Sequence, residues 1–281
     1  MKDTKDYLDV CVSGVPSFSI SYGPNIDYWH KERDESPNQE PWETQVFIKM
    51  LSDQPRILDI GANVGWYSCV ASALSMGKAE IHAFEPEPGN FALLQGNLEI
   101  NGFSSAHAHQ MALSNINGEG SLFLNEDNPG DHRISDISGR QSIDITLRTL
   151  DSFLDTKFCP DLVKIDVQGA EPLVFDGAKG TFKRAGESLA MLVEFQPESM
   201  GIEVSHDFVD TLFSFGLPLF DLYPYDGGAL RPIGREVLHE AVEGCLHPKF
   251  ETHINILMAP NDDRFARIES LIGAPFTQWS H

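Results

Sequence analysis

The stretch from residue 56 to residue 77 passes from an apolar strand through a glycine turn into a helix. Its first part, RILDIGA at 56–62, has the pattern of a buried strand, and NVGWYSCVASALSMG at 63–77 has the pattern of a helix that ends at Gly77. Parallel strands need such a crossover helix between them, so this segment favours an α/β fold with a parallel sheet.

The alternation of strands and helices continues along the chain. A hairpin pattern around Asp226, Gly227 and Gly228 precedes the last apolar strand, which indicates that one late strand runs antiparallel. The whole pattern predicts a Rossmann-like, doubly wound α/β sheet, mostly parallel. Further strands are predicted at 79–86, 106–114, 120–125, 142–150, 161–169, 188–195 and 252–260, and further helices at 88–103, 171–186 and 204–216.

The charge of the chain disfavours some classes of partner. Its 281 residues include 20 Lys+Arg and 42 Asp+Glu, a formal net charge of −22 at pH 7. Nucleic acids and anionic membranes attract basic surfaces, so we expect neither as a partner. No apolar run approaches the ~18–20 residues of a membrane span, and we see no secretory signal. The four cysteines are widely spaced, which predicts reduced thiols in a cytoplasmic protein.

The glycine turn predicts a ligand site at the carboxyl ends of the strands. Gly61 and Gly65 allow a tight turn, so that Ala62, Asn63 and the following helix amides can approach a ligand closely. Glu85 ends the next strand, 20 residues after Gly65, where a carboxylate can accept both hydroxyls of a ribose.

Three interpretations of this turn compete: a turn without a ligand, a dinucleotide site and a site for S-adenosylmethionine. A dinucleotide site prefers G-x-G-x-x-G, but Asn63 replaces the second glycine and Ser68 stands at the third position. The pattern D-x-G-x-N-x-G with a strand-end acid favours S-adenosylmethionine. Asp59 is then expected to orient the turn and to help hold the ammonium group of the ligand. The adenine is expected near Gln110, Met111 and Ala112.

A second motif, VKIDVQGAE at 163–171, carries a family resemblance. Together with DIGANVGWYS, AFEPEP, ALSN, TLRTLDSF and VEFQPE, in this order, it makes the chain resemble the FkbM family of S-adenosylmethionine-dependent methyltransferases. The resemblance extends from about Glu43 to Ile256. One departure is Gln168, which stands where the family usually has glutamate.

The resemblance implies a seven-stranded class I methyltransferase sheet with S-adenosylmethionine as the methyl donor. It also implies O-methylation of a hydroxyl on a sugar or natural-product small molecule, so we expect a small-molecule or glycan acceptor. We expect residues 1–281 to form one such domain. Within it, residues 1–55 are expected to form an N-terminal extension or lid, and 115–150 an insertion with an acceptor-side loop.

Transfer to an alcohol needs a base, because an alcohol is a poor nucleophile until it loses its proton. Asp166 ends the strand beside the first one and is one candidate for base or orienting group. Glu194 ends the following strand, where apolar neighbours raise a carboxyl pKa, and is a second candidate. His132, in the Gly/Pro loop of the insertion, is a third.

Other functions stay open from the residues alone. The carboxylates of Asp166 and Glu194 offer oxygen atoms of the kind that bind a divalent metal ion. We find no dense carboxylate triplet in the sequence and therefore predict no obligatory metal. An NAD(P)-dependent oxidoreductase is one alternative, disfavoured by the glycine pattern. A non-catalytic S-adenosylmethionine-binding module is another.

Overall fold

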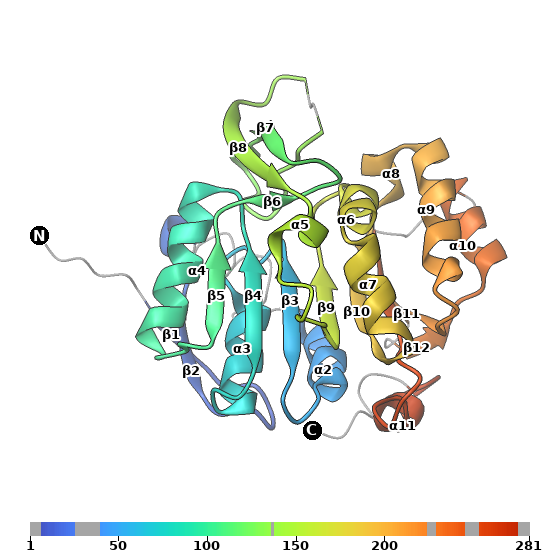
Figure 1. The fold of residues 1–281 in the computed structure, drawn as a ribbon, viewed down its shortest axis with the longest axis horizontal. Helices are drawn as coiled ribbons and strands as arrows, with labels where there is room; N and C mark the ends of the chain where they lie inside the picture. The colour runs from blue at the N-terminus through green and yellow to red at the C-terminus, as the bar shows by residue number, and fades with distance from the viewer. Residues whose placement is uncertain (1–6, 26–39, 136–137, 224–228, 245–252, 275–281) are drawn as a thin grey trace, which may run out of the picture.

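A central sheet of eight strands organises the molecule (Figure 1). The computed structural model describes residues 7–25, 40–135, 138–223, 229–244 and 253–274. The strand order is β12-β11-β13-β10-β9-β3-β4-β5. Their bounds are β3 Arg56–Ile60, β4 Glu80–Phe84, β5 Ala106–His109, β9 Leu162–Ile165, β10 Ala190–Phe195, β11 Leu219–Tyr223, β12 Ala229–Pro232 and β13 Ile254–Met258.

The predicted fold class is confirmed by the direction of the strands. β3, β4, β5, β9 and β10 are parallel, and β13 is inserted antiparallel between β10 and β11. An eighth strand, β12, adds to the expected seven because the chain turns back after β11 and pairs with it at the sheet edge. The predicted hairpin turn at 226–228 lies outside the described residues.

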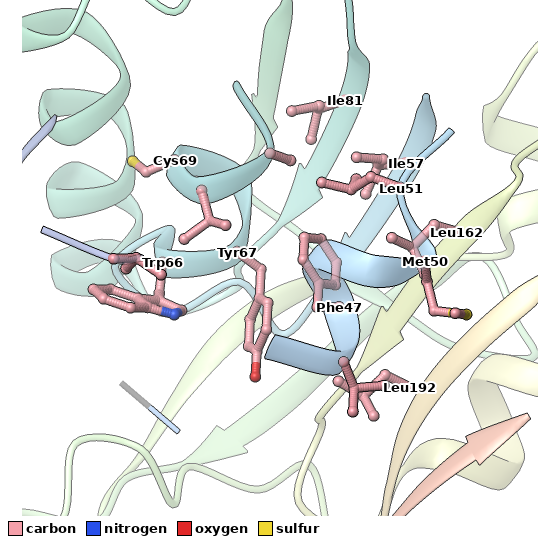
Figure 2. Packing of buried hydrophobic residues seen from close by; sticks show 14 of the residues in the cluster. Phe47, Met50, Leu51, Ile57, Trp66, Tyr67, Cys69, Ile81, Leu162 and Leu192 are labelled. Atoms are coloured by element: carbon pink, nitrogen blue, oxygen red, sulfur yellow. The ribbon is translucent and has the colours of Figure 1, made fainter. Parts of the chain in front are cut away.

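Helices cover both faces of this sheet. On one face α2 and α3 pack against β3, and Figure 2 shows Phe47 of α2 between Tyr67 of α3 and the apolar side chains of Leu51 and Ile57. On the other face the packing is dominated by phenylalanines, with the ring centroids of Phe175 and Phe208 5.0 Å apart. The helices are α2 Pro41–Met50, α3 Trp66–Ser75, α4 Pro88–Ile100, α5 Leu150–Phe153, α6 Glu171–Gly177, α7 Lys179–Ala185, α8 Pro197–Met200, α9 Ile202–Ser214, α10 Arg235–Val242 and α11 Phe265–Glu269.

The segment predicted as one helix over 171–186 is two helices, α6 and α7. The break falls at Ala178, next to Gly177, where an added Cβ would lie 1.9 Å from the backbone oxygen of Ser114. Tertiary packing against the strand-end segment therefore overrides the helical pattern at this point.

A second, smaller sheet stands at the carboxyl ends of the parallel strands (Figure 1). It is formed by β6 Ala112–Leu113, β8 Ser142–Arg148 and β7 Gly118–Phe123. The strand predicted over 106–114 is thus divided between the two sheets, as β5 and β6. The two extra strands predicted in the insertion are present as β7 and β8, and the polar loop between them begins above the central sheet.

The N-terminal segment forms a hairpin, β1 Tyr7–Val10 with β2 Phe18–Ser21, which packs on α4. The side-chain amide of Asn97 accepts from the Ser21 amide at 2.8 Å and donates to the Ser21 carbonyl at 3.0 Å, and Asn101 pairs with Ser19 in the same way, at 2.8 and 2.7 Å. Within the described ranges, no helix is both long and apolar enough to cross a bilayer. The described cysteines are free thiols, and Cys245 lies outside those ranges.

A histidine pair links β4 and β5. The Nδ1 atom of His82 lies 2.9 Å from Nε2 of His109, and the two rings are stacked within 10°. Burial, followed by the neighbouring histidines, lowers the pKa of His109 to about 4, and burial also lowers the pKa of His82. The pair is therefore stable in the fold only while it is largely uncharged.

Candidate functional site

A cavity of about 780 Å³ opens at the carboxyl ends of β3, β4, β9 and β10, beneath the insertion. It is therefore at the edge of the sheet where open α/β folds bind ligands. It brings together most of the residues predicted from the sequence, and among them Asp59, Gly65 and Gln110 lie outside its lining. The predicted residues that line it are Gly61, Ala62, Asn63, Glu85, Met111, Ala112, His132, Asp166 and Glu194.

The glycine turn needs glycine at its first position for reasons of space. The amides of Gly61 and Ala62 both donate to the Phe84 carbonyl, at 3.0 and 2.9 Å, which fixes the turn to the end of β4. Gly61 has φ +79°, and a Cβ there would lie 1.8 Å from the backbone oxygen of Asp166. The turn thus packs directly against the end of β9.

Asp59 and Gly65 shape the turn from below. Oδ2 of the buried Asp59 accepts from the amide and the hydroxyl of Ser68, at 3.0 and 2.6 Å, at the start of α3. Burial raises the pKa of Asp59 to about 6, although the bonds from Ser68 act in the opposite direction. Gly65, with φ +88°, is the residue that precedes α3. Asp59 therefore has the predicted turn-orienting position, but its carboxylate is not placed for direct contact with a ligand ammonium.

Glu85 presents its carboxylate at the cavity while both oxygens hold backbone amides. Oε2 accepts from Asn63 N at 2.8 Å and Oε1 from Glu87 N at 2.9 Å. Burial raises the pKa of Glu85 to about 8, against the effect of these two bonds. Each oxygen keeps a second lone pair, so the group can still accept from a ligand.

Asn63 supplies a further sign of a ligand next to Glu85. Its side-chain Oδ1 is buried and has no hydrogen-bond partner among the described residues. Buried polar atoms are normally paired, so an unpaired oxygen in a cavity wall indicates a position for a ligand donor. Phe84, Met111 and Ala112 line the same region and offer an apolar surface for a flat ring.

The loop of the insertion closes over the glycine turn. The Pro129 carbonyl accepts from the side-chain amides of Asn63 and Asn90, at 3.4 and 3.1 Å. Within the loop, Asp131 pairs with Arg133 and Arg140, each at 2.5 Å. Burial alone would raise the pKa of Asp131, but hydrogen bonds from these two arginines and from Asn125 lower it overall. This ionic network fixes the shape of the loop.

His132 lines the cavity, but its hydrogen bonding does not suit a base. The backbone amide of Asn125 donates to His132 Nδ1 at 3.0 Å, which assigns the proton of the neutral ring to Nε2. Burial lowers the pKa of the ring, so the neutral form is favoured. In this arrangement Nε2 is a donor, and a base would need its lone pair there. In this tautomer the ring can donate to a ligand through Nε2–H, and the role of His132 as a base stays a prediction.

Asp166 and Glu194 form a pair of carboxyl groups joined by Gln168. The Gln168 Nε2 group donates to Asp166 Oδ1 and to Glu194 Oε2, both at 2.7 Å. Burial acts to raise both pKa values, but the Lys164 ammonium and hydrogen bonds lower the pKa of Asp166 overall. The pKa of Glu194 is raised by burial and by the Asp166 charge. The two shifts run in opposite directions, so Asp166 is the more readily ionised carboxyl group of the pair.

Lys164 is a site residue to which the sequence analysis gave no role. Its side chain is 3% exposed, and Nζ lies 3.6 Å from Asp166 Oδ2 and 5.4 Å from the centre of the Tyr67 ring. Burial acts to lower the pKa of Lys164, but four surrounding carboxylates raise it overall, so the ammonium stays charged. The sequence did contain one indication of this role, a lysine inside the apolar pattern of β9, because a buried charge requires charged or polar partners.

Two of the four carboxylates around Lys164, Glu40 and Glu43, lie at the start of α2, and the sequence analysis gave them no role. Glu40 Oε2 accepts from the Tyr67 hydroxyl at 2.6 Å, and Glu43 Oε1 accepts from Asn255 Nδ2 at 3.0 Å. Burial, followed by the Glu40 charge, raises the pKa of Glu43 to about 7.

Across the described parts of the chain, no group of three or more His, Cys, Asp and Glu side chains is arranged to hold a metal ion.

Comparison with known proteins gives one family and several distant relatives. The family model described as Methyltransferase FkbM domain matches residues 59–217. Methyltransferase 1 of Beauveria bassiana (strain ARSEF 2860) is 26% identical over an alignment of 152 residues, and the match covers 46% of this chain and 61% of that protein. The match thus spans less than two thirds of the length of this curated relative.

Two solved structures are similar at low identity. One is precorrin-6y C5,15-methyltransferase from Geobacter metallireducens GS-15, 14% identical with a TM-score of 0.43, covering 79% of this chain and 87% of that chain. The other is a putative rRNA methylase from Clostridium thermocellum, 9% identical with a TM-score of 0.44, covering 80% of this chain and 97% of that chain.

Proposed function

Since this chain belongs to the methyltransferase FkbM domain family, with more than half of its length matched, we propose that it methylates a hydroxyl oxygen of a sugar or natural-product small molecule. The methyl donor in this proposal is S-adenosylmethionine. Family membership favours this transferase over the oxidoreductase considered from the sequence.

The donor half of the cavity fits S-adenosylmethionine in its chemistry. Glu85 offers carboxylate lone pairs to ribose hydroxyls, and the unpaired Asn63 Oδ1 offers an acceptor to an ammonium or hydroxyl group. Phe84, Met111 and Ala112 supply the apolar wall that an adenine requires. When bound, S-adenosylmethionine supplies a methyl carbon that is electrophilic because it is attached to a sulfonium.

The observation that carries the proposal is the contact of Lys164 with Asp166 at the end of β9, 3.6 Å apart, in the same cavity as Glu85. An ionised Asp166 can take the proton from an acceptor hydroxyl. The Lys164 ammonium beside it stabilises negative charge that develops on the acceptor oxygen. Gln168 holds Asp166 in place through its side-chain amide.

The insertion completes the site in this proposal. In this proposal the insertion, residues 115–150, supplies the acceptor-side loop, which also contacts the glycine turn through the Pro129 carbonyl and excludes water from the reacting groups. The Nε2–H of His132 donates to an oxygen of the acceptor. Residues 1–281 act as one class I methyltransferase domain, with 1–55 as its N-terminal extension.

The test is transfer of a labelled methyl group to a panel of glycosides, with Asp166→Asn as the diagnostic variant. Loss of a positioned general base lowers kcat by about 10²–10⁴-fold, while the affinity for S-adenosylmethionine, measured by calorimetry, stays near the wild-type value. A folded Asp166→Asn variant with normal turnover would remove Asp166 from the mechanism. Binding of S-adenosylmethionine without transfer to any hydroxyl compound would favour the non-catalytic module instead.

A further inference from the structure

We propose that the acceptor carries an ammonium group beside its hydroxyls, as an amino sugar does. This inference rests on the proposed function, because it concerns the acceptor half of the same cavity. We define the acceptor half by the end of β9, the end of β10, the start of α2 and the start of β13. Its charge, its spare hydrogen-bonding capacity and one unpaired amide all favour such a molecule.

The charges in the acceptor half do not balance. Glu40, Glu43, Asp166 and Glu194 surround one buried cation, Lys164, and the partly exposed His253 ring lies 3.5 Å from Glu194 Oε1. Burial, the largest cause, and neighbouring carboxylates raise the pKa values of Glu43, to about 7, and of Glu194, and the described residues offer too little positive charge to offset this. A cationic ligand would supply it, whereas a carboxylate or phosphate on the ligand would add to the excess.

The side-chain amide nitrogens of Gln168 and Asn255 are already used by these carboxyl groups. The Gln168 amide nitrogen binds Asp166 and Glu194, and the Asn255 amide nitrogen binds Glu43. No hydrogen bond from a described residue reaches the side-chain oxygens of Gln168 and Asn255. The capacity left for a ligand is therefore mostly acceptor capacity, which hydroxyl and ammonium donors satisfy.

Gln196 gives an independent sign that a ligand completes this region. Its side chain lines the cavity and is 5% exposed. Its Oε1 accepts from the Ser199 hydroxyl, but its amide nitrogen has no hydrogen-bond partner among the described residues. This nitrogen is not fully enclosed, so it can donate to a hydroxyl oxygen of a ligand in the cavity, whose own proton serves the neighbouring carboxylates.

The experiment compares matched acceptors at saturating S-adenosylmethionine. Methyl glycosides of glucosamine, galactosamine and mannosamine are each assayed as the free amine and as the N-acetyl derivative, with methyl glucuronide as an anionic probe. We expect kcat/KM for at least one free amine to exceed that of its N-acetyl partner by about 10- to 100-fold, the usual worth of a charge-assisted hydrogen bond. The glucuronide is expected to be the poorest acceptor.

Glu43→Gln tests the origin of the preference, with Glu99→Gln as a matched control on the exposed side of α4. The ratio of amine to N-acetyl activity is expected to fall in Glu43→Gln and to stay unchanged in Glu99→Gln. Glu40→Gln provides a second variant if melting temperatures show that Glu43→Gln is poorly folded. Equal activity on amines and N-acetyl derivatives, or a preference for the glucuronide, overturns the inference. Transfer to no hydroxyl compound refutes the proposed function itself, and the inference falls with it.

Discussion

Removal of the Lys164 charge is expected to move the pH profile of the enzyme. In Lys164→Met the ammonium 3.6 Å from Asp166 Oδ2 is lost. Burial raises the pKa of Asp166, and this ammonium is the largest of the effects that lower it. The Coulomb energy of two unit charges at this distance is about 4–5 kcal/mol at an effective dielectric constant of ~20. Water that enters the space left by the side chain reduces this value. At about 1.4 kcal/mol for each pH unit, the expected change is about 1–3 pH units.

The sign follows from the role of Asp166 as a base. Activity requires the ionised carboxylate and is lost as pH falls through its pKa, so a higher pKa moves the acid limb of kcat to higher pH. The assay is kcat against pH at saturating donor and acceptor. Lys164→Arg, which keeps the charge, serves as the control and is expected to retain most of the wild-type acid limb. An unchanged acid limb in a folded Lys164→Met variant would show that Lys164 does not tune the base.

Three further predictions concern separate parts of the molecule. Glu85→Gln is expected to weaken S-adenosylmethionine binding by about 1–3 kcal/mol, because one of the two carboxyl oxygens that can accept from the ribose becomes an amide nitrogen. Calorimetry that gives unchanged affinity contradicts this, and NADH is expected to show no saturable binding to the wild type. His132→Gln keeps a hydrogen-bond donor and is expected to retain more kcat than His132→Ala, with normal affinity for S-adenosylmethionine in both variants. Equal losses of about 10²–10⁴-fold would instead support His132 as the base. For His109, the folded state disfavours the proton, so stability is lost as pH falls from about 6.5 towards the folded pKa of about 4. Urea unfolding across this range is expected to show a smaller loss in His109→Phe than in the wild type, and parallel curves would refute the assignment.

The donor half could be predicted from the sequence because its geometry is local. Gly61, Asn63 and Glu85 belong to one strand–turn–helix–strand unit, and the spacing of such a unit fixes where its residues meet. Periodicity likewise predicted the parallel strands. It did not show that Asp59 would be enclosed beneath the turn, because Ser68 reaches it only after α3 has formed.

The acceptor half depends on contacts between distant parts of the chain. Glu43 and Asn255 are 212 residues apart in the sequence, and no pattern at either position indicates that they share a hydrogen bond. The tautomer of His132 depends on a backbone amide whose position is set by the loop itself. These features follow from tertiary packing, which a single sequence does not specify position by position.

The hydrogen bond between Glu43 and Asn255 has a consequence for how relatives of this protein are compared. Both residues, with Glu40 and His253, lie outside the matched family segment, residues 59–217, which contains the glycine turn, Glu85, the loop and Asp166. The two flanks of the chain therefore meet at the one part of the cavity that the family signature does not cover. Relatedness measured over the shared segment leaves out the part of the acceptor half that the flanks supply, so substitutions in the flanks can alter acceptor choice separately. Two members of the family can inherit the same donor machinery and still methylate different molecules.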